Sequence, residues 1–259
     1  MNYRNLKNQE ISLLEKNGCA AEDWSRIQVK QEFDPQWLRD VYFAGEVKLG
    51  VFSGKVEVEK GIEKNSGIYG SYIKDCSIGD GVYISNVDNL IAYDIGEQVA
   101  IENVNTLLVN GESTFGNGIE LDVLNEDGGR ELPIIDKLSS QIAYLMVNYR
   151  HDEKLIENLG TIIKDYAESK KSDKGTIEKG ARIVSTTTIR NVNFGSYSIV
   201  YGARLLEEGT IRSCEEDKTL IGEGVIAKGF IVLSGSKVDG GAIIENSFVG
   251  QSVKIGKQF

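Results

Sequence analysis

The sequence predicts a mainly β protein built as a triangular parallel β-solenoid, and three observations support this prediction. First, the segment IGDGVYISNV, which starts at Ile78, returns 17 residues later as IGEQVAIENV from Ile95. Second, large apolar residues recur within each repeat at steps of six, six and five, so that each repeat contains three short strands that bury their side chains by stacking. Third, the step of 17 recurs at further starting positions, namely Ile177 and Phe194, then Ile221, Val238 and Ile255.

A column of small and polar residues marks the corners of the predicted coils. Asn and Gly tolerate the left-handed backbone of a tight turn, so a fixed column of them indicates turns. The glycines near the repeat starts are interpreted in the same way, as corners and not as a phosphate-binding loop. The corner residues, eight positions after each start, are Asn86, Asn103, Ser185, Gly202, Gly229 and Asn246.

The repeat also resembles a known family. Each repeat unit begins with Ile or Val, continues with Gly or an acidic residue and two free positions, and then has Ser, Ala or Val. This pattern is similar to the hexapeptide repeat of the left-handed parallel β-helix superfamily. The whole chain looks like the N-terminal part of a longer, uncharacterised bacterial hexapeptide-repeat family. The resemblance implies a left-handed β-helix and a homo-oligomer, with a trimer as the suggested form. The superfamily includes acyltransferases that act on small molecules such as sugars, and it also includes scaffolds without activity. For an enzyme, it implies an acyl-CoA or acyl carrier protein donor; the residues themselves indicate no cofactor.

Composition excludes several classes of protein. The formal net charge is −10, and no basic stripe is present that would attract a nucleic acid. The cysteines, Cys19, Cys76 and Cys214, are scattered without CxxC spacing, which favours reduced thiols over a disulfide framework or a zinc site. No signal-peptide pattern or membrane-length apolar run is present, so we expect a cytoplasmic protein without a membrane partner.

Residues 1–45 do not follow the repeat, and we expect them to form an N-terminal helical cap. Apolar residues between Ile11 and Leu14, followed by Gly18, predict a short helix and its end. Asp34, followed by a proline, predicts the start of a second one. A cap of this kind covers the open strand edge of the first coil. The tryptophans expected to close the core are Trp24 and Trp37.

Residues 46–124 are predicted to form the first β-helix segment. Apolar residues that step by six, six, five and five place its start before the clear repeats. These residues are Val56, Ile62, Ile68, Ile73 and Ile78.

Residues 125–175 interrupt the repeats with a loop and a predicted α-helical hairpin. Apolar residues follow helical spacing in two stretches, from Ile135 to Tyr149 and from Leu155 to Tyr166. Asp152 lies between them as a predicted N-cap. Two apolar stripes need a surface, which is either the outside of the β-helix or another subunit.

Two candidate polar sites fall in this insertion. The loop 125–131 combines mixed charges with paired glycines, and its candidate residues are Asn125, Glu126 and Arg130; a solvated turn is the competing interpretation. His151, the single histidine, lies between the two predicted helices. Acyltransferases that this chain resembles use a histidine as general base, so His151 is the catalytic candidate, against the simpler interpretation of a surface residue at a helix end.

Residues 176–259 are predicted to form the second β-helix segment, which stops in mid-coil. We therefore expect further coils, or a partner, beyond Phe259. The fifth residue after each start should point outward, yet this column is apolar except for Arg182. We predict that it is an interface, buried by the helical hairpin or by another copy of the chain. Its members are Tyr83, Ala100, Ile199, Ile226 and Ile243.

Two functions remain open on the sequence. The first is a hexapeptide-repeat transferase that moves an acyl group to a sugar or sugar-nucleotide acceptor, with its main catalytic residues outside this chain. The second is a noncatalytic β-helix scaffold or oligomerisation module. Histidines in downstream repeats and binding of acyl-CoA would favour the first.

Overall fold

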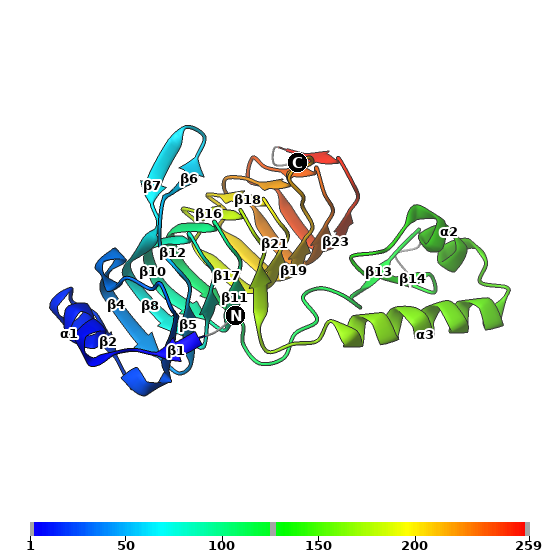
Figure 1. The fold of residues 1–259 in the computed structure, drawn as a ribbon. Helices are drawn as coiled ribbons and strands as arrows, with labels where there is room; N and C mark the ends of the chain where they lie inside the picture. The colour runs from blue at the N-terminus through cyan, green and yellow to red at the C-terminus, as the bar shows by residue number, and fades with distance from the viewer. Residues whose placement is uncertain (1–2, 125–127, 257–259) are drawn as a thin grey trace.

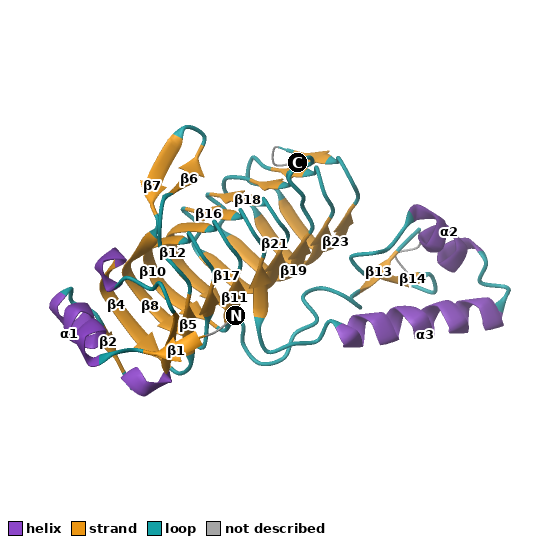
Figure 2. Ribbon diagram, in the orientation of Figure 1, coloured by secondary structure: helices purple, strands orange, loops and turns teal. Residues whose placement is uncertain are grey.

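A computed structural model describes residues 3–124 and 128–256, and these residues form a mainly β structure (Figure 1). Within them, twenty strands pair into one large sheet, in which every pairing is parallel except that of β1 with β3. Figure 2 shows that the helices lie at two places, at the N-terminal end of the sheet and in an arm at its side. None of the helices in the described residues is long and apolar enough to cross a bilayer.

The strands of the large sheet are short and follow one another closely along the chain. Those before the insertion are β1 (Tyr3–Asn5), β2 (Ala20–Ala21), β3 (Ile27–Lys30), β4 (Leu38–Ala44), β5 (Val47–Leu49), β8 (Gly67–Lys74), β9 (Ser77–Ile78), β10 (Tyr83–Ile91), β11 (Tyr93–Ile95) and β12 (Ala100–Leu108). Those after it are β15 (Gly175–Ile177), β16 (Arg182–Val184), β17 (Thr188–Phe194), β18 (Ile199–Tyr201), β19 (Leu205–Ile211), β20 (Leu220–Ile221), β21 (Ile226–Val232), β22 (Lys237–Val238), β23 (Ile243–Val249) and β24 (Lys254–Ile255).

The sequence period of 17 is the register of this sheet. Tyr83 lies opposite Ala100 where β10 pairs with β12, and Ile226 lies opposite Ile243 where β21 pairs with β23. Because each apolar residue stacks on its repeat mate, the core is continuous along the sheet. The predicted corners are confirmed, since all six residues have a positive φ, from 40° at Asn246 to 69° at Gly202. The stacked core includes Ile84, Ile101, Ile183, Val200 and Ile221.

The loop after β19 shifts the predicted columns by one strand segment. Ile221, which the sequence pattern placed among the repeat starts, stacks on Val200. Ile211 occupies the start column and pairs with Val232. Ile211 and Val232 are 21 residues apart and not 17, so the loop adds four residues. A sequence alignment based on the period alone misses this shift. All three strand segments of a coil have inward apolar residues at nearly the same spacing, so one segment can be mistaken for the next.

The N-terminal segment is not only a helical cap. The helix α1 (Asn8–Lys16) ends before Gly18, whose φ is 82°, as predicted. The second predicted helix is a 3-10 turn over Pro35–Trp37, with Asp34 as its N-cap. However, β2 and β3 already pair in parallel with β4 and β5, so the stacking starts before residue 46. A second 3-10 turn is Trp24–Arg26, and Trp24 and Trp37 pack against the core.

A β-hairpin replaces part of the predicted first segment. The strands β6 (Lys55–Glu59) and β7 (Ile62–Asn65) pair antiparallel and project from the sheet (Figure 1). The prediction that Val56 and Ile62 belong to coils is wrong. Val56 and Val58 alternate with charged residues, which is the pattern of a strand with one apolar face, and this face packs on the outside of the sheet. The resulting cluster consists of Val56, Val58, Tyr83, Ala100 and Val184.

The insertion contains the predicted helical hairpin, preceded by a small antiparallel sheet. The first helix starts later than the apolar spacing suggested, because residues 131–133 form a strand, residues 136–137 form a turn, and Ser139 is the N-cap. Asp152 caps the second as predicted, since its carboxylate accepts a hydrogen bond of 3.0 Å from the Leu155 N–H. The elements are β13 (Glu120–Asp122), β14 (Glu131–Pro133), α2 (Ser140–Asn148) and α3 (Glu153–Ser169).

The apolar side chains of the insertion form a second core, and this core also packs against one part of the sheet. Ile134, Met146 and Ile163 are buried in this second core. Ile231 of β21 is buried in the same cluster, and Phe248 of β23 packs against it. Of the two surfaces predicted for the apolar stripes, the structure therefore shows the outside of the sheet.

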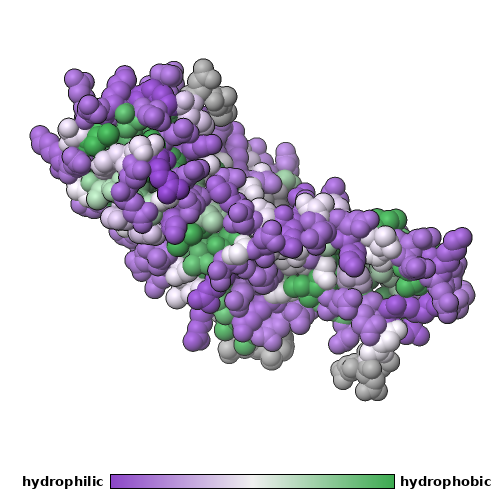
Figure 3. All heavy atoms as spheres, turned by 90° about the horizontal axis from the view of Figure 1, so that it is seen from below, coloured by the Kyte–Doolittle hydropathy of each residue, from purple (hydrophilic) through white to green (hydrophobic). Residues whose placement is uncertain are grey.

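Seen from below, the molecule is mostly hydrophilic, and hydrophobic residues form small separate patches (Figure 3).

Candidate functional site

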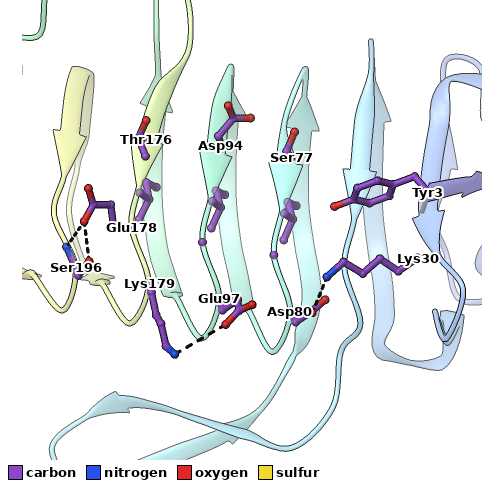
Figure 4. A pocket seen from close by; sticks show the side chains of 15 residues that line it. Tyr3, Lys30, Ser77, Asp80, Asp94, Glu97, Thr176, Glu178, Lys179 and Ser196 are labelled. Atoms are coloured by element: carbon purple, nitrogen blue, oxygen red, sulfur yellow. Dashed lines mark hydrogen bonds and ion pairs between the residues drawn. The ribbon is translucent and has the colours of Figure 1, made fainter. Parts of the chain in front are cut away.

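A shallow groove follows one corner of the sheet, where β9, β11 and β15 lie side by side (Figure 4). We call it the corner groove; its volume is about 540 Å³. Ser77, Asp94 and Thr176 are in register on adjacent strands and form one side of it. The other labelled residues that line it are Tyr3, Lys30, Asp80, Glu97, Glu178, Lys179 and Ser196.

Two glycines keep the floor of the corner groove flat. A Cβ atom on Gly79 would lie 2.7 Å from the carbonyl group of Gly96 on the next coil, and a Cβ atom on Gly96 would lie 2.7 Å from the Lys179 nitrogen. A side chain does not fit at either position, because the backbones of successive coils are in contact there. The repeat therefore requires glycine at these corners for packing.

Ion pairs and hydrogen bonds occupy one side of the groove. The Lys30 Nζ atom lies 2.6 Å from Asp80 Oδ2, and the Lys179 Nζ atom lies 3.9 Å from Glu97 Oε2. Glu178 Oε2 accepts hydrogen bonds from the N–H and the hydroxyl of Ser196, at 3.0 and 2.6 Å. Burial opposes the charge of Asp80, but Lys30 and the Val51 N–H together hold the pKa of this carboxyl below its ordinary value.

The opposite side of the groove offers polar groups to a ligand. The Asp94 carboxylate is exposed and makes no hydrogen bond or ion pair with other residues that the structure describes. The Thr176 side chain lines the groove beside Asp94, and its backbone N–H donates to Asn193 Oδ1 at 2.7 Å. Tyr3 closes one end of the groove with an aromatic ring (Figure 4). This arrangement provides acceptors, donors and one apolar ring along a single surface.

A second polar site lies where the insertion meets the sheet. Its centre is Asp136, whose side chain is 5% exposed. Tyr166 of α3 donates its phenol proton to Asp136 Oδ1 at 2.7 Å, and Arg212 Nη1 lies 3.5 Å from Asp136 Oδ2. Asn117 accepts a hydrogen bond from the Asp136 N–H at 2.9 Å. We call Asn117, Asp136, Tyr166 and Arg212 the junction cluster.

The junction cluster keeps Tyr166 protonated. Burial and the hydrogen bond to Asp136 both raise the pKa of the Tyr166 phenol well above its ordinary value. Two ammonium groups also face its ring: the Lys137 and Lys170 Nζ atoms lie 5.2 and 5.1 Å from the ring centroid. Tyr166 therefore acts as a hydrogen-bond donor that holds the buried carboxylate.

The structure describes two of the four candidate residues of the insertion, Arg130 and His151. His151 is exposed in the turn between α2 and α3, at the outer end of the insertion, and its ring lies 5.6 Å from that of Tyr149. Asn125 and Glu126 lie outside the described residues. Arg130 donates to the Val147 carbonyl oxygen at 3.0 Å, so it attaches the loop to α2. Arg130 and His151 belong to the insertion, and neither lines the corner groove.

The predicted interface column does not exist as one column. Tyr83 and Ile199 share a column that the β6–β7 hairpin partly covers, and Tyr83 is 6% exposed. Ile226 and Ile243 lie on another side of the sheet, in register with Leu205. The cause is the four-residue shift in the loop after β19. Ile243 is 61% exposed and keeps the character of a contact residue.

Sequence reasoning missed both polar sites. Several groove residues occupy repeat positions that we interpreted as corners, although charged residues stand two positions after three repeat starts, at Asp80, Glu97 and Lys179. The junction cluster joins residues separated by up to 95 positions, from Asn117 to Arg212, and no local motif connects them. The signal that could have found the corner groove was the series of charged residues near the repeat starts. Packing of the coils alone does not require charged residues there.

Comparisons with known proteins give a family without an assigned activity. An uncharacterized protein of Treponema pallidum (strain Nichols) is 28% identical over 235 residues, which are 86% of this chain and 32% of that protein. The chain thus spans about a third of the length of this curated relative. The model of the family described as "Domain of unknown function (DUF4954)" matches residues 3–259, and the chain belongs to that family.

Proposed function

We propose that the chain is a left-handed parallel β-helix of the hexapeptide-repeat type, and that it serves as the acceptor-binding part of an acyltransferase-like protein. The parallel pairings at an offset of 17, on three successive segments of each repeat, support a solenoid. The corner groove is the acceptor site. In this proposal the acyl donor is acyl-CoA or an acyl carrier protein, and the main catalytic residues lie outside residues 1–259.

One observation carries the acceptor site: the Asp94 carboxylate and the Thr176 hydroxyl face the same groove as the Tyr3 ring. A sugar presents hydroxyl groups around a ring with apolar C–H faces. Carboxylate oxygens accept hydrogen bonds from such hydroxyls, and an aromatic ring packs against the C–H face. The groove volume of about 540 Å³ falls in the range of small-molecule sites.

Ligand-observed NMR with a panel of monosaccharides and sugar nucleotides tests this assignment. We expect saturation transfer to at least one of these probes, and an affinity loss of about tenfold in Asp94→Ala, because a hydrogen bond to a charged group is removed. The control is Asp88→Ala, which removes an equally exposed carboxylate on β10 outside the groove. Equal binding by Asp94→Ala and the wild type would contradict the acceptor site.

Donor binding is tested separately, on the longer protein. Calorimetry with acyl-CoA should give saturable heat, and acyl transfer to a sugar that binds the groove should follow. If sugar binds but acyl-CoA does not, the chain is a sugar-binding β-helix without transferase activity.

The thiols of Cys19 and Cys76 are buried and form no disulfide, which supports a reducing, cytoplasmic location for this protein.

A noncatalytic scaffold is the second candidate, and a different observation favours it. Leu205, Ile226 and Ile243 are in register on β19, β21 and β23; the first two are half-buried and Ile243 is 61% exposed. A row of exposed apolar residues supports contact between copies of the chain. Light scattering tests this candidate: Ile226→Asp with Ile243→Asp should dissociate a homo-oligomer, whereas an unchanged mass would contradict an interface on this row.

A further inference from the structure

Three cationic side chains gather around the junction cluster, in a chain whose formal net charge is −10. The Lys137 and Lys170 ammonium groups face the ring of Tyr166, and Arg212 lies beside Asp136. Among the described residues, neither Lys137 nor Lys170 is ion-paired with a carboxylate, whereas the neighbouring Lys171 is paired with Glu112 and Glu168. The Asp136 carboxylate balances the charge of Arg212, so the two lysines add positive charge that no carboxylate of the cluster balances.

A small cavity lies among these groups. Its volume is about 150 Å³, and its walls include Lys170, Arg212 and Asn193. The carboxylate of Asp136 also faces it, but Tyr166 and Arg212 already neutralise and occupy that group. Glu178 lines the cavity as well, and its Oε2 atom is engaged by Ser196 on the side of the corner groove (Figure 4).

We propose that this cavity binds a phosphate-type oxyanion, either inorganic phosphate or the phosphoryl group of a small ester. Arg212 presents five N–H donors in a planar fork, and one edge remains for an oxyanion when the other faces Asp136. Lys170 supplies a mobile point charge from the end of α3, and the Asn193 side-chain amide supplies a neutral donor. The cavity has room for a phosphate group but not for a nucleotide. The cavity shares Thr176 and Glu178 with the corner groove, but its cationic residues, Lys170 and Arg212, do not line that groove. The proposal does not depend on the function proposed there.

The anion also stabilises the contact between the insertion and the sheet. Lys170 follows the last turn of α3, and Arg212 begins the loop after β19, so an oxyanion between them joins two segments that are far apart in the chain. A ligand that binds the folded state but not the unfolded state raises the melting temperature. Phosphate should therefore slow hydrogen exchange in α3 more than in the coils.

Calorimetry and phosphorus NMR line broadening with inorganic phosphate test the site. We expect saturable binding by the wild type and a loss of about tenfold or more in Lys170→Gln and in Arg212→Gln, since each removes a charge-assisted hydrogen bond. Lys171→Gln is the matched control, because Lys171 is adjacent in sequence and does not line the cavity; it should bind phosphate within about twofold of the wild type. If Arg212→Gln fails to fold, Lys170→Gln alone decides.

The two sources of the anion are distinguished by a second probe. Tighter binding of glycerol 3-phosphate than of inorganic phosphate assigns the site to a phosphorylated small molecule, and the reverse order assigns it to the free ion. The proposal is overturned if neither probe binds at millimolar concentration, if chloride at equal ionic strength has the same effect, or if Lys171→Gln weakens binding as much as Lys170→Gln. Asp94→Ala should leave phosphate binding unchanged, which separates this test from that of the corner groove.

Discussion

The repeated coils and the insertion bury their apolar residues in different ways. In the coils, a residue such as Ile183 is fully buried between repeat mates on both neighbouring strands, Ile101 and Val200. In the insertion, a small apolar core lies against the sheet. Next to this core, the buried Asp136 carboxylate contacts Tyr166 of α3 and Arg212, which follows β19. Coil stability is therefore shared along the stack, whereas the order of the insertion depends on its own small core and on a few contacts with the sheet.

The largest effect is expected for a core residue of the coils. Ile183→Ala should lower the free energy of unfolding by about 2–5 kcal/mol, because it leaves a cavity between two stacked neighbours. Denaturant titration followed by circular dichroism measures this loss. Ile243→Ala is the control, and since Ile243 is mostly exposed its effect should stay near 0.5 kcal/mol or less. Similar losses for the two variants would contradict the described register.

A smaller and local effect is expected for the junction. Asp136→Ala leaves the Tyr166 phenol without its acceptor, which should destabilise the insertion by about 1–3 kcal/mol. Hydrogen exchange should become faster in α3 and remain slow in β10 and β12. Asp165→Ala, which removes an exposed carboxylate from the same helix, should change neither. Faster exchange across the whole sheet would show that the insertion and the coils unfold as one unit.

Acid should weaken the coils through the pair of Lys30 and Asp80. The folded pKa of Asp80 is lowered, so its contribution is complete above the ordinary aspartate pKa near 3.9 and is lost as the pH falls through the lower folded value. Because the Asp80 side chain is 38% exposed, solvent screening limits this contribution to less than about 1 kcal/mol. Asp80→Asn and the wild type should differ more in stability at about pH 6 than at about pH 3.

The smallest effect is expected at the outer end of the insertion. His151 is exposed and lies far along the arm, so His151→Ala should change the free energy of unfolding by less than about 0.5 kcal/mol. Under the proposed function, with the main catalytic residues elsewhere, acyl transfer should also persist in this variant. A loss of transfer without a loss of stability would restore His151 as a catalytic residue.

Much of the fold follows from the sequence, because the period is a local property that packing enforces at every coil. The apolar columns and the corners at Asn86 and Asn103 were predictable in this way. The shift after Ile211 was not, since four added residues produce another apolar column that looks alike. The β6–β7 hairpin was also hidden, because the alternation at Val56 and Val58 is compatible with a coil strand as well.

The candidate sites were less predictable for a different reason. Outward-facing strand positions tolerate many polar residues, so Asp94 of β11 and Thr176 of β15 carry no local signature that separates a ligand site from a solvated surface. The junction cluster forms only when α3 packs beside the loop that begins at Arg212. Apolar periodicity predicts the two helices but gives no partner for their polar residues.

The two chain segments that connect the insertion to the stack, which we call its stem, are hydrogen-bonded to each other. Ser113 and Ser172 exchange two backbone hydrogen bonds, of 2.9 and 3.0 Å, so the arm leaves and re-enters the stack through adjacent positions. An arm with a paired stem can lengthen or shorten in a lineage at little cost in loop entropy and without moving the coils on either side. Related chains should therefore differ most in the length of this arm, and least in the spacing of the coils.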